Sequence, residues 1–125
     1  MLKKILPLAL LAALLTGCNA TFTNLTPTRQ VRNETGYYPV EVAFNTRQST
    51  IRWDTIEPQI LVGTNRFSMR PTQLMKNRWE GLVPVPEDGN LVYYRYRFDF
   101  EFNDFGGPKR DNALSQEYRL QVLDE

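Results

Sequence analysis

The longest regular pattern in the chain, from Val92 to Phe102, constrains the fold most strongly. Apolar side chains occupy every second position of this segment, at Val92, Tyr94, Tyr96, Phe98, Phe100 and Phe102. The positions between them hold Tyr93, Arg95, Arg97, Asp99 and Glu101. A period of two is the period of a β-strand with one buried face. The sequence therefore predicts a long strand here, with its aromatic face in the core of the domain.

Shorter segments of the same kind fill much of the remaining chain. The ranges predicted as strands are 38–45, 50–57, 59–62, 66–69, 78–85 and 116–123, and 26–35 is predicted to be an edge strand or an ordered linker. Gly63 between 59–62 and 66–69 predicts a tight hairpin, because glycine tolerates a positive φ. In the segment 50–57, Trp53 alternates with Ile51 and Thr55, so we expect it in the core.

About seven short strands in roughly 100 residues, with turn signals every 8–12 residues, are typical of a β-sandwich. We therefore predict an all-β, immunoglobulin-like (Ig-like) sandwich, with a small closed barrel as the alternative. The only cysteine, Cys18, precedes the strands, so the inter-sheet disulfide of antibody domains is excluded. The closest expected type is a disulfide-free sandwich of the early-set or fibronectin kind.

The first residues have the composition of an export signal. Lys3 and Lys4 precede an apolar run from Ile5 to Leu15, and the segment ends in Leu15-Thr16-Gly17-Cys18. This order resembles the signal peptide and lipobox of bacterial lipoproteins. The resemblance implies cleavage before Cys18 and lipid attachment to its thiol. The apolar run is shorter than the roughly 20 residues of a membrane-spanning helix, and an ordinary secretory signal with a chance cysteine is the remaining alternative.

The expected organisation follows from that cleavage site. Residues 1–17 are predicted to be the signal peptide, 18–24 the lipidated N-terminus with a short tether, and 25–125 the sandwich domain. Six tether residues extend at most about 20 Å, which keeps the domain close to the bilayer. Asn19 stands where aspartate is the usual inner-membrane retention signal in enteric bacteria, so we expect the outer membrane, on its periplasmic or surface face.

Composition excludes most catalytic chemistry. The chain has no histidine and its single cysteine belongs to the lipobox, which excludes Ser-His-Asp and Cys-His catalysis and most transition-metal sites. Carboxylate-only chemistry and a calcium site are the remaining options. A sandwich of this size has little room for a substrate cleft, and no ordered ligand spacing supports calcium. A net charge of +1 gives no reason to expect nucleic acid as a partner. The sequence predicts a protein with no enzymatic activity, cofactor or metal.

A second resemblance covers about 25 residues, from Trp79 to Asp104. The segment Trp79–Pro86, followed by a turn and by Val92–Phe98, is similar to the core of the Ig-like modules that bind glycogen and starch. In that family a strand begins with a tryptophan, and the next strand contains a tyrosine, a basic residue and an aromatic residue in that order. The resemblance implies an Ig-like fold and, more weakly, a carbohydrate ligand.

Three features are candidate binding sites. The segment from Asn103 to Leu114 reads as a long loop, which offers Phe105 on a glycine-rich base beside Lys109 and Arg110. The outward face of the long strand carries Tyr93, Arg95 and Arg97, residue types that are common in protein interfaces. Trp79 is the candidate for stacking on a sugar, because Gly81 and Val83 beside it are small.

Each feature also has a purely structural interpretation. Phe105 can fold back onto the core edge, the charged face can be an ordinary solvent face, and Trp79 can be core. We expect a membrane-anchored module that binds another cell-envelope protein, without enzymatic activity. The alternative is a carbohydrate-binding module for cell-wall glycan or surface polysaccharide that uses Trp79 and Phe105.

Overall fold

The computed structural model describes residues 20–124, and these residues form an all-β fold, as the sequence predicts. Its ten strands are β1 (Ala20–Asn24), β2 (Arg29–Val31), β3 (Tyr37–Thr46), β4 (Ile51–Val62), β5 (Asn65–Ser68), β6 (Arg70–Pro71), β7 (Arg78–Pro84), β8 (Leu91–Asp104), β9 (Gly107–Leu114) and β10 (Tyr118–Leu123). The predicted long strand is β8, and the predicted hairpin is formed by β4 and β5, with Gly63 at φ +59° in its turn.

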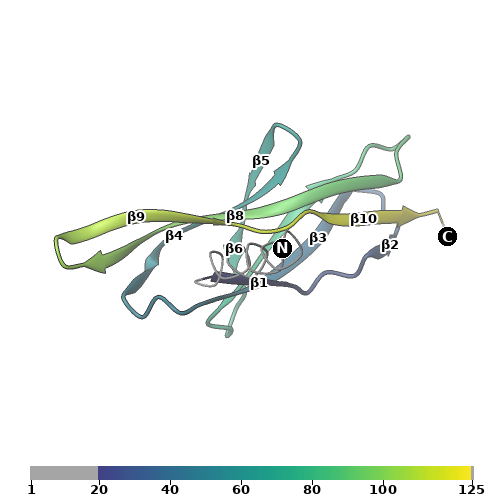
Figure 1. The fold of residues 1–125 in the computed structure, drawn as a ribbon. Coiled ribbons are helices and arrows are strands. Elements are labelled where there is room, and N and C mark those ends of the chain that lie inside the picture. The colour runs from purple at the N-terminus through teal and green to yellow at the C-terminus, as the bar shows by residue number, and fades with distance from the viewer. Residues whose placement is uncertain (1–19, 125) are drawn as a thin grey trace, which may run out of the picture.

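The strands form two open sheets that face each other as in a β-sandwich (Figure 1). The four-stranded sheet has the order β1-β3-β7-β6. The six-stranded sheet has the order β2-β10-β8-β4-β5, and β9 pairs with β8 on the side that β10 also uses. The pairing of β2 with β10 is parallel and the other pairings are antiparallel.

One apolar core lies between the two sheets, and β3 and β8 supply half of its buried residues. The alternating residues of both strands point inward as their sequences predict. The buried members on these strands are Tyr38, Val40, Val42 and Phe44 on β3, and Tyr94, Tyr96, Phe98 and Phe100 on β8. Phe44 lies at the centre, with its ring centroid 4.9 Å from that of Phe98 and 6.4 Å from that of Trp79. Aromatic pairs of this kind add to the burial of apolar area.

A polar cluster joins the two sheets beside β1. The hydroxyl of Tyr96 donates to Asn24 Oδ1 (2.7 Å), and Asn24 Nδ2 donates to the hydroxyl of Tyr94 (2.8 Å). Thr26 Oγ1 accepts from the backbone N–H of Glu41 (2.8 Å) and lies 3.3 Å from the Tyr96 hydroxyl. Hydroxyl groups of β8 are therefore hydrogen-bonded to the end of β1, which belongs to the other sheet.

The domain begins earlier than its predicted boundary at residue 25. Residues Ala20–Asn24, expected to be tether, form β1 and pair with β3 from Thr46 to Val42. The reason is that Phe22 and Ala20 cover the core at the sheet edge, where Phe22 lies 5.1 Å from Phe44 between ring centroids. Within the predicted edge segment 26–35, only Arg29–Val31 forms a strand.

The ranges 50–57 and 59–62 form one strand, β4, and the expected core position of Trp53 is wrong. The register of β4 against β8 shifts between Arg52 and Glu57. Side chains between these two residues therefore do not alternate regularly between the core and the solvent. Trp53 is 45% exposed and stacks on the buried Trp79, with ring centroids 6.2 Å apart and planes 7° apart.

The predicted long loop from Asn103 to Leu114 is also wrong. β8 extends to Asp104, turns at Phe105-Gly106 and returns as β9, paired with β8 from Gly107 to Leu114 (Figure 1). Gly107 has φ +113°, which favours glycine. β9 was not recognisable as a strand because it lies at a sheet edge and carries mostly exposed polar side chains.

Strand pairing places the connections at two opposite ends of the molecule. The register pairs Ala20 with Thr46, Ala43 with Arg78 and Ile51 with Phe102. The N-terminal end therefore holds the start of β1, the β3–β4 and β6–β7 loops and the β8–β9 turn. The distal end holds the β2–β3 and β7–β8 connections and the C-terminus, which are joined by backbone hydrogen bonds such as Val85 N to Gly36 O (2.9 Å) and Arg32 N to Leu123 O (2.8 Å).

Replacing Tyr96 with phenylalanine should destabilise the fold through the polar cluster. Asn24 Oδ1 would lose its hydrogen bond from the Tyr96 hydroxyl in a part-buried place. We expect the free energy of unfolding to fall by about 1–2 kcal/mol in urea denaturation. The control Tyr93→Phe removes a hydroxyl from a half-exposed side chain and should change stability by less than about 0.5 kcal/mol. Equal effects of the two changes would contradict this role of the cluster.

Alkaline pH should weaken the fold through the same residue. Burial raises the pKa of Tyr96 well above its ordinary value of 10.0. The folded state therefore keeps the hydroxyl protonated, while the unfolded state ionises it near that value. Tyr96 should therefore make the free energy of unfolding fall as pH rises above 10, and it should cause no pH dependence well below that value. Measured by urea denaturation at increasing pH, the decline should be shallower in Tyr96→Phe, and an unchanged slope would refute the assignment.

Candidate functional site

An apolar patch lies on the outer face of the four-stranded sheet, toward the distal end. The register sets Tyr37 opposite Pro84 and Pro39 opposite Leu82. In a sheet with one solvated face these outward positions are normally polar. Here Tyr37 and Leu82 are 49% and 51% exposed, and Pro39 lies exposed between them.

The patch continues into a groove of about 770 Å³ between β7 and the β5–β6 segment. The residues that line it are Tyr37, Pro39, Arg66, Phe67, Ser68, Met69, Arg70, Glu80, Gly81 and Leu82. Gly81 forms part of its floor. A Cβ there would lie 2.8 Å from Ile60 Cδ1 and 3.3 Å from Met69 Cγ, so these two side chains would have to shift to admit a larger residue. We call this the β5–β7 groove.

One wall of the β5–β7 groove is an unpaired strand edge. β6 pairs with β7 only at Trp79 and Glu80. The N–H of Val85 donates toward β3, and neighbouring residues of an antiparallel strand alternate in direction, so the backbone N–H and C=O of Leu82 face away from β3. Among residues 20–124, no strand pairs with this side of Leu82. An extended peptide could therefore add to β7 here.

The charge of the groove comes from two arginines. Arg70 lies 3.2 Å from Glu80 in an exposed ion pair. Arg66, on β5, is exposed and has no ion pair within the described residues. The groove thus combines apolar walls with one unpaired positive charge at its rim.

A smaller hollow of about 460 Å³ lies on the other side of Pro39. It is lined by Leu25, Thr26, Pro27, Gln30, Val31, Pro39, Val40, Glu41 and Glu80. Pro39 and Glu80 border both hollows, so the two hollows adjoin at these residues.

The predicted charged face of β8 is engaged within the chain. Arg95 lies 3.3 Å from Glu117, and Arg97 lies 3.3 Å from Asp99. Tyr93 remains half-exposed next to them. The two arginines are therefore paired at the places where the sequence predicts partner contacts, although Tyr93 is accessible.

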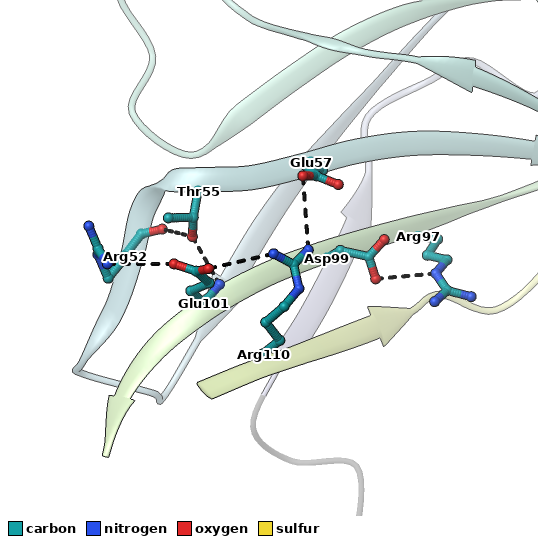
Figure 2. A network of polar contacts seen from close by, with 7 residues as sticks. All are labelled: Arg52, Thr55, Glu57, Arg97, Asp99, Glu101 and Arg110. Carbon is teal, nitrogen blue, oxygen red and sulfur yellow. Dashed lines mark hydrogen bonds and ion pairs between the residues drawn. The ribbon is translucent and has the colours of Figure 1, made fainter. Parts of the chain in front are cut away.

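Figure 2 shows that the charges further along β8 hold the hairpin to β4. Glu101 lies 3.5 Å from both Arg52 and Arg110, and Arg110 also approaches Glu57 at 3.9 Å. Thr55 Oγ1 accepts from the N–H of Glu101 (2.9 Å) and donates to the carbonyl of Arg52 (2.6 Å). The network spans the register shift of β4, so its first role is structural.

The tip of the β8–β9 hairpin holds the other predicted loop residues. Phe105 is fully exposed and does not fold back onto the core edge. Asp104 accepts a hydrogen bond from the N–H of Phe105 (2.8 Å) and lies 3.1 Å from Lys109. These contacts, first the backbone bond and then Lys109, lower the pKa of Asp104.

Trp79 is 5% exposed, so the prediction that it stacks on a sugar is wrong. Its ring is enclosed by Phe44, Phe98 and Trp53. The indole that reaches the surface is that of Trp53. The predicted lipidation site, Cys18, lies outside the described residues.

Residues 20–124 contain no cluster of three or more histidine, cysteine, aspartate or glutamate side chains able to hold a metal ion. The same range has no helix with the length and hydropathy needed to cross a bilayer.

Comparisons with known proteins leave the family open. No protein-family model matches the chain, and the curated proteins give no significant match. One solved structure with similarity is that of a DUF4785 family protein from Legionella pneumophila, with 9% sequence identity and a TM-score of 0.43. The match covers 82% of this chain, which spans 28% of the length of that chain. Similarity at this level carries no argument about fold or function.

Sequence reasoning missed the β5–β7 groove, although part of its signal was present. Tyr37-Tyr38-Pro39-Val40 and Gly81-Leu82-Val83-Pro84 are apolar at both the inward and the outward positions of their strands. Such runs indicate a strand that is covered on both faces. The sequence could not show that the segment 66–70 lies beside β7.

Proposed function

We propose that the protein is a lipid-anchored, non-enzymatic binding module of the bacterial cell envelope, with an Ig-like domain that binds an extended segment of another envelope protein. The observation that carries this proposal is the β5–β7 groove, where the apolar side chains of Tyr37, Pro39 and Leu82 lie beside a free strand edge. Exposed apolar surface of this kind is characteristic of interaction sites.

Strand addition explains why these features occur together. The N–H and C=O of Leu82 would bond to the backbone of the incoming segment, and alternate side chains of that segment would reach the apolar walls. Arg66 at the rim favours a partner with an acidic or carboxylate group nearby. Binding of this type needs no catalytic group.

The lipobox supplies the anchor in this proposal. Cys18 stands two residues before Ala20, where β1 begins. A lipid on that thiol would hold the N-terminal end of the domain at the bilayer, and the β5–β7 groove would then face away from it. Asn19 after the cysteine supports the outer membrane as the location.

The change Leu82→Asp should abolish partner binding without unfolding the domain. An exposed carboxylate in place of an apolar contact at the centre of an interface should weaken binding by at least about tenfold. The matched control is Leu114→Asp on β9, since Leu114 is 52% exposed and Leu82 is 51% exposed. The measurement is photo-crosslinking in living cells from p-benzoylphenylalanine placed at Tyr37.

The expected result is a single crosslinked envelope protein that is lost in Leu82→Asp and retained in Leu114→Asp. An amide hydrogen-exchange experiment on the complex should also show protection at Leu82. Equal loss in both variants, or crosslinks that persist in Leu82→Asp, would rule out the β5–β7 groove as the binding site.

A glycan ligand is the second candidate, and the exposed face of Trp53 favours it. One face of this indole stacks on Trp79 and the side chain is 45% exposed, which leaves flat aromatic surface for a sugar ring. In that case cell-wall oligosaccharides should change the tryptophan fluorescence, and Trp53→Ala should abolish the change while Leu82→Asp leaves it intact. No fluorescence response to such oligosaccharides would remove this candidate.

A further inference from the structure

We propose that the N-terminal end of the domain is itself a membrane-contact surface, which inserts Leu74 and Phe105 into the bilayer interface beside the lipid anchor. The inference rests on the proposed anchor at Cys18, and adds a contact made by the folded domain. β1 pairs Ala20 with Thr46, so the first residue that the structure describes lies at this end.

The two side chains have unusual positions for apolar residues. Leu74 in the β6–β7 loop and Phe105 in the β8–β9 turn are both fully exposed. Leu74 also has φ +66°, a conformation that non-glycine residues with a bulky side chain rarely adopt. The fold therefore holds a large apolar side chain in solvent at the cost of backbone strain. The strand register places the connections that carry Leu74 and Phe105 at the same end of the strands.

Exposed charges outside the ion pairs of residues 20–124 occur at both ends, and each end has both signs, with Asp54 and Asp111 toward the N-terminal end and Arg29, Arg66 and Arg119 toward the distal end. At the N-terminal end, Arg47 and Lys76 are exposed, and neither forms an ion pair within the described residues. At the distal end, the connections carry Glu34, Glu87 and Asp88, which are likewise exposed and outside the ion pairs of residues 20–124.

Arg47 and Lys76, in the loops of this end, favour an anionic bilayer as the occupant of the surface. Lysine and arginine beside a membrane are attracted to anionic headgroups, whereas acidic residues are repelled. Apolar and aromatic side chains next to basic residues are typical of proteins that lie in the interface. A lipid anchor two residues before β1 would bring this surface to the headgroups without a long tether.

Thiol accessibility tests the inference on the full chain. The protein is expressed with its leader, purified from membranes and inserted into preformed vesicles of phosphatidylethanolamine and phosphatidylglycerol. Variants Leu74→Cys, Phe105→Cys and Val31→Cys are labelled with a membrane-impermeant maleimide. Because the lipid occupies the thiol of Cys18, the introduced cysteine is the only free thiol in the mature chain.

The fold alone and the membrane contact predict opposite orders of reactivity. Leu74 and Phe105 are fully exposed in the folded domain, whereas Val31 is 63% exposed, so without membrane contact Val31→Cys should be the slowest. With membrane contact, Leu74→Cys and Phe105→Cys should react with the maleimide about tenfold more slowly than Val31→Cys. Adding Arg47→Glu or Lys76→Glu should speed labelling at position 74 by roughly fivefold each. Arg66→Glu in the β5–β7 groove is the matched control and should have no effect.

The possible failures are distinct. Fast labelling of Leu74→Cys and Phe105→Cys, in protein that stays with the vesicles and has Cys18 blocked, would overturn the membrane contact and leave the anchor intact. Protection in cells that is absent in pure lipid vesicles would assign these loops to a protein partner, which also overturns it. Wild-type protein with a reactive Cys18 and no vesicle association would refute the proposed anchor, and the membrane contact with it.

Discussion

The pairing of β1 with β3 is the interaction on which the rest of this account depends. It begins at Ala20, two residues after Cys18, and it fixes the direction of β1, with Ala20 at the end of the domain that holds the β3–β4 loop. The Tyr96–Asn24 hydrogen bond ties the end of β1 to the opposite sheet, so this direction is set by both layers. A lipid on Cys18 would therefore hold the domain in one orientation, since almost no chain remains between the anchor and the fold.

In that orientation, the two ends of the domain would have different functions. The N-terminal end presents Leu74 and Phe105 together with the exposed basic residues Arg47 and Lys76. The β5–β7 groove lies toward the distal end, because Tyr37 and Leu82 stand at the start of β3 and the end of β7. In the proposed arrangement, one end attaches to lipid and the other is free to bind an envelope protein.

Sequence patterns predicted the strands that bury one apolar face. They did not predict the segments whose structure depends on pairing with a neighbouring strand. The long strand β8 was predictable because its inward face is aromatic throughout. β9 was not, because it is held by cross-strand pairs such as Arg110–Glu101 and buries little apolar area. The exposed position of Trp53 depends on a register shift that the residue types of β4 do not indicate. The β5–β7 groove needs the chain to cross from one sheet to the other, which periodicity does not reveal.

The most direct test of the central claim is paramagnetic broadening of backbone amide signals in the lipidated, isotope-labelled protein, held in nanodiscs with gadolinium-chelating headgroups. The broadening falls steeply with distance from the bilayer surface. We expect strong loss of the signals of Arg47, Lys76 and Phe105, while those of Gly36 and Gly89 at the distal end remain. Stronger loss at Gly36 and Gly89, or uniform loss over the domain, would contradict the account.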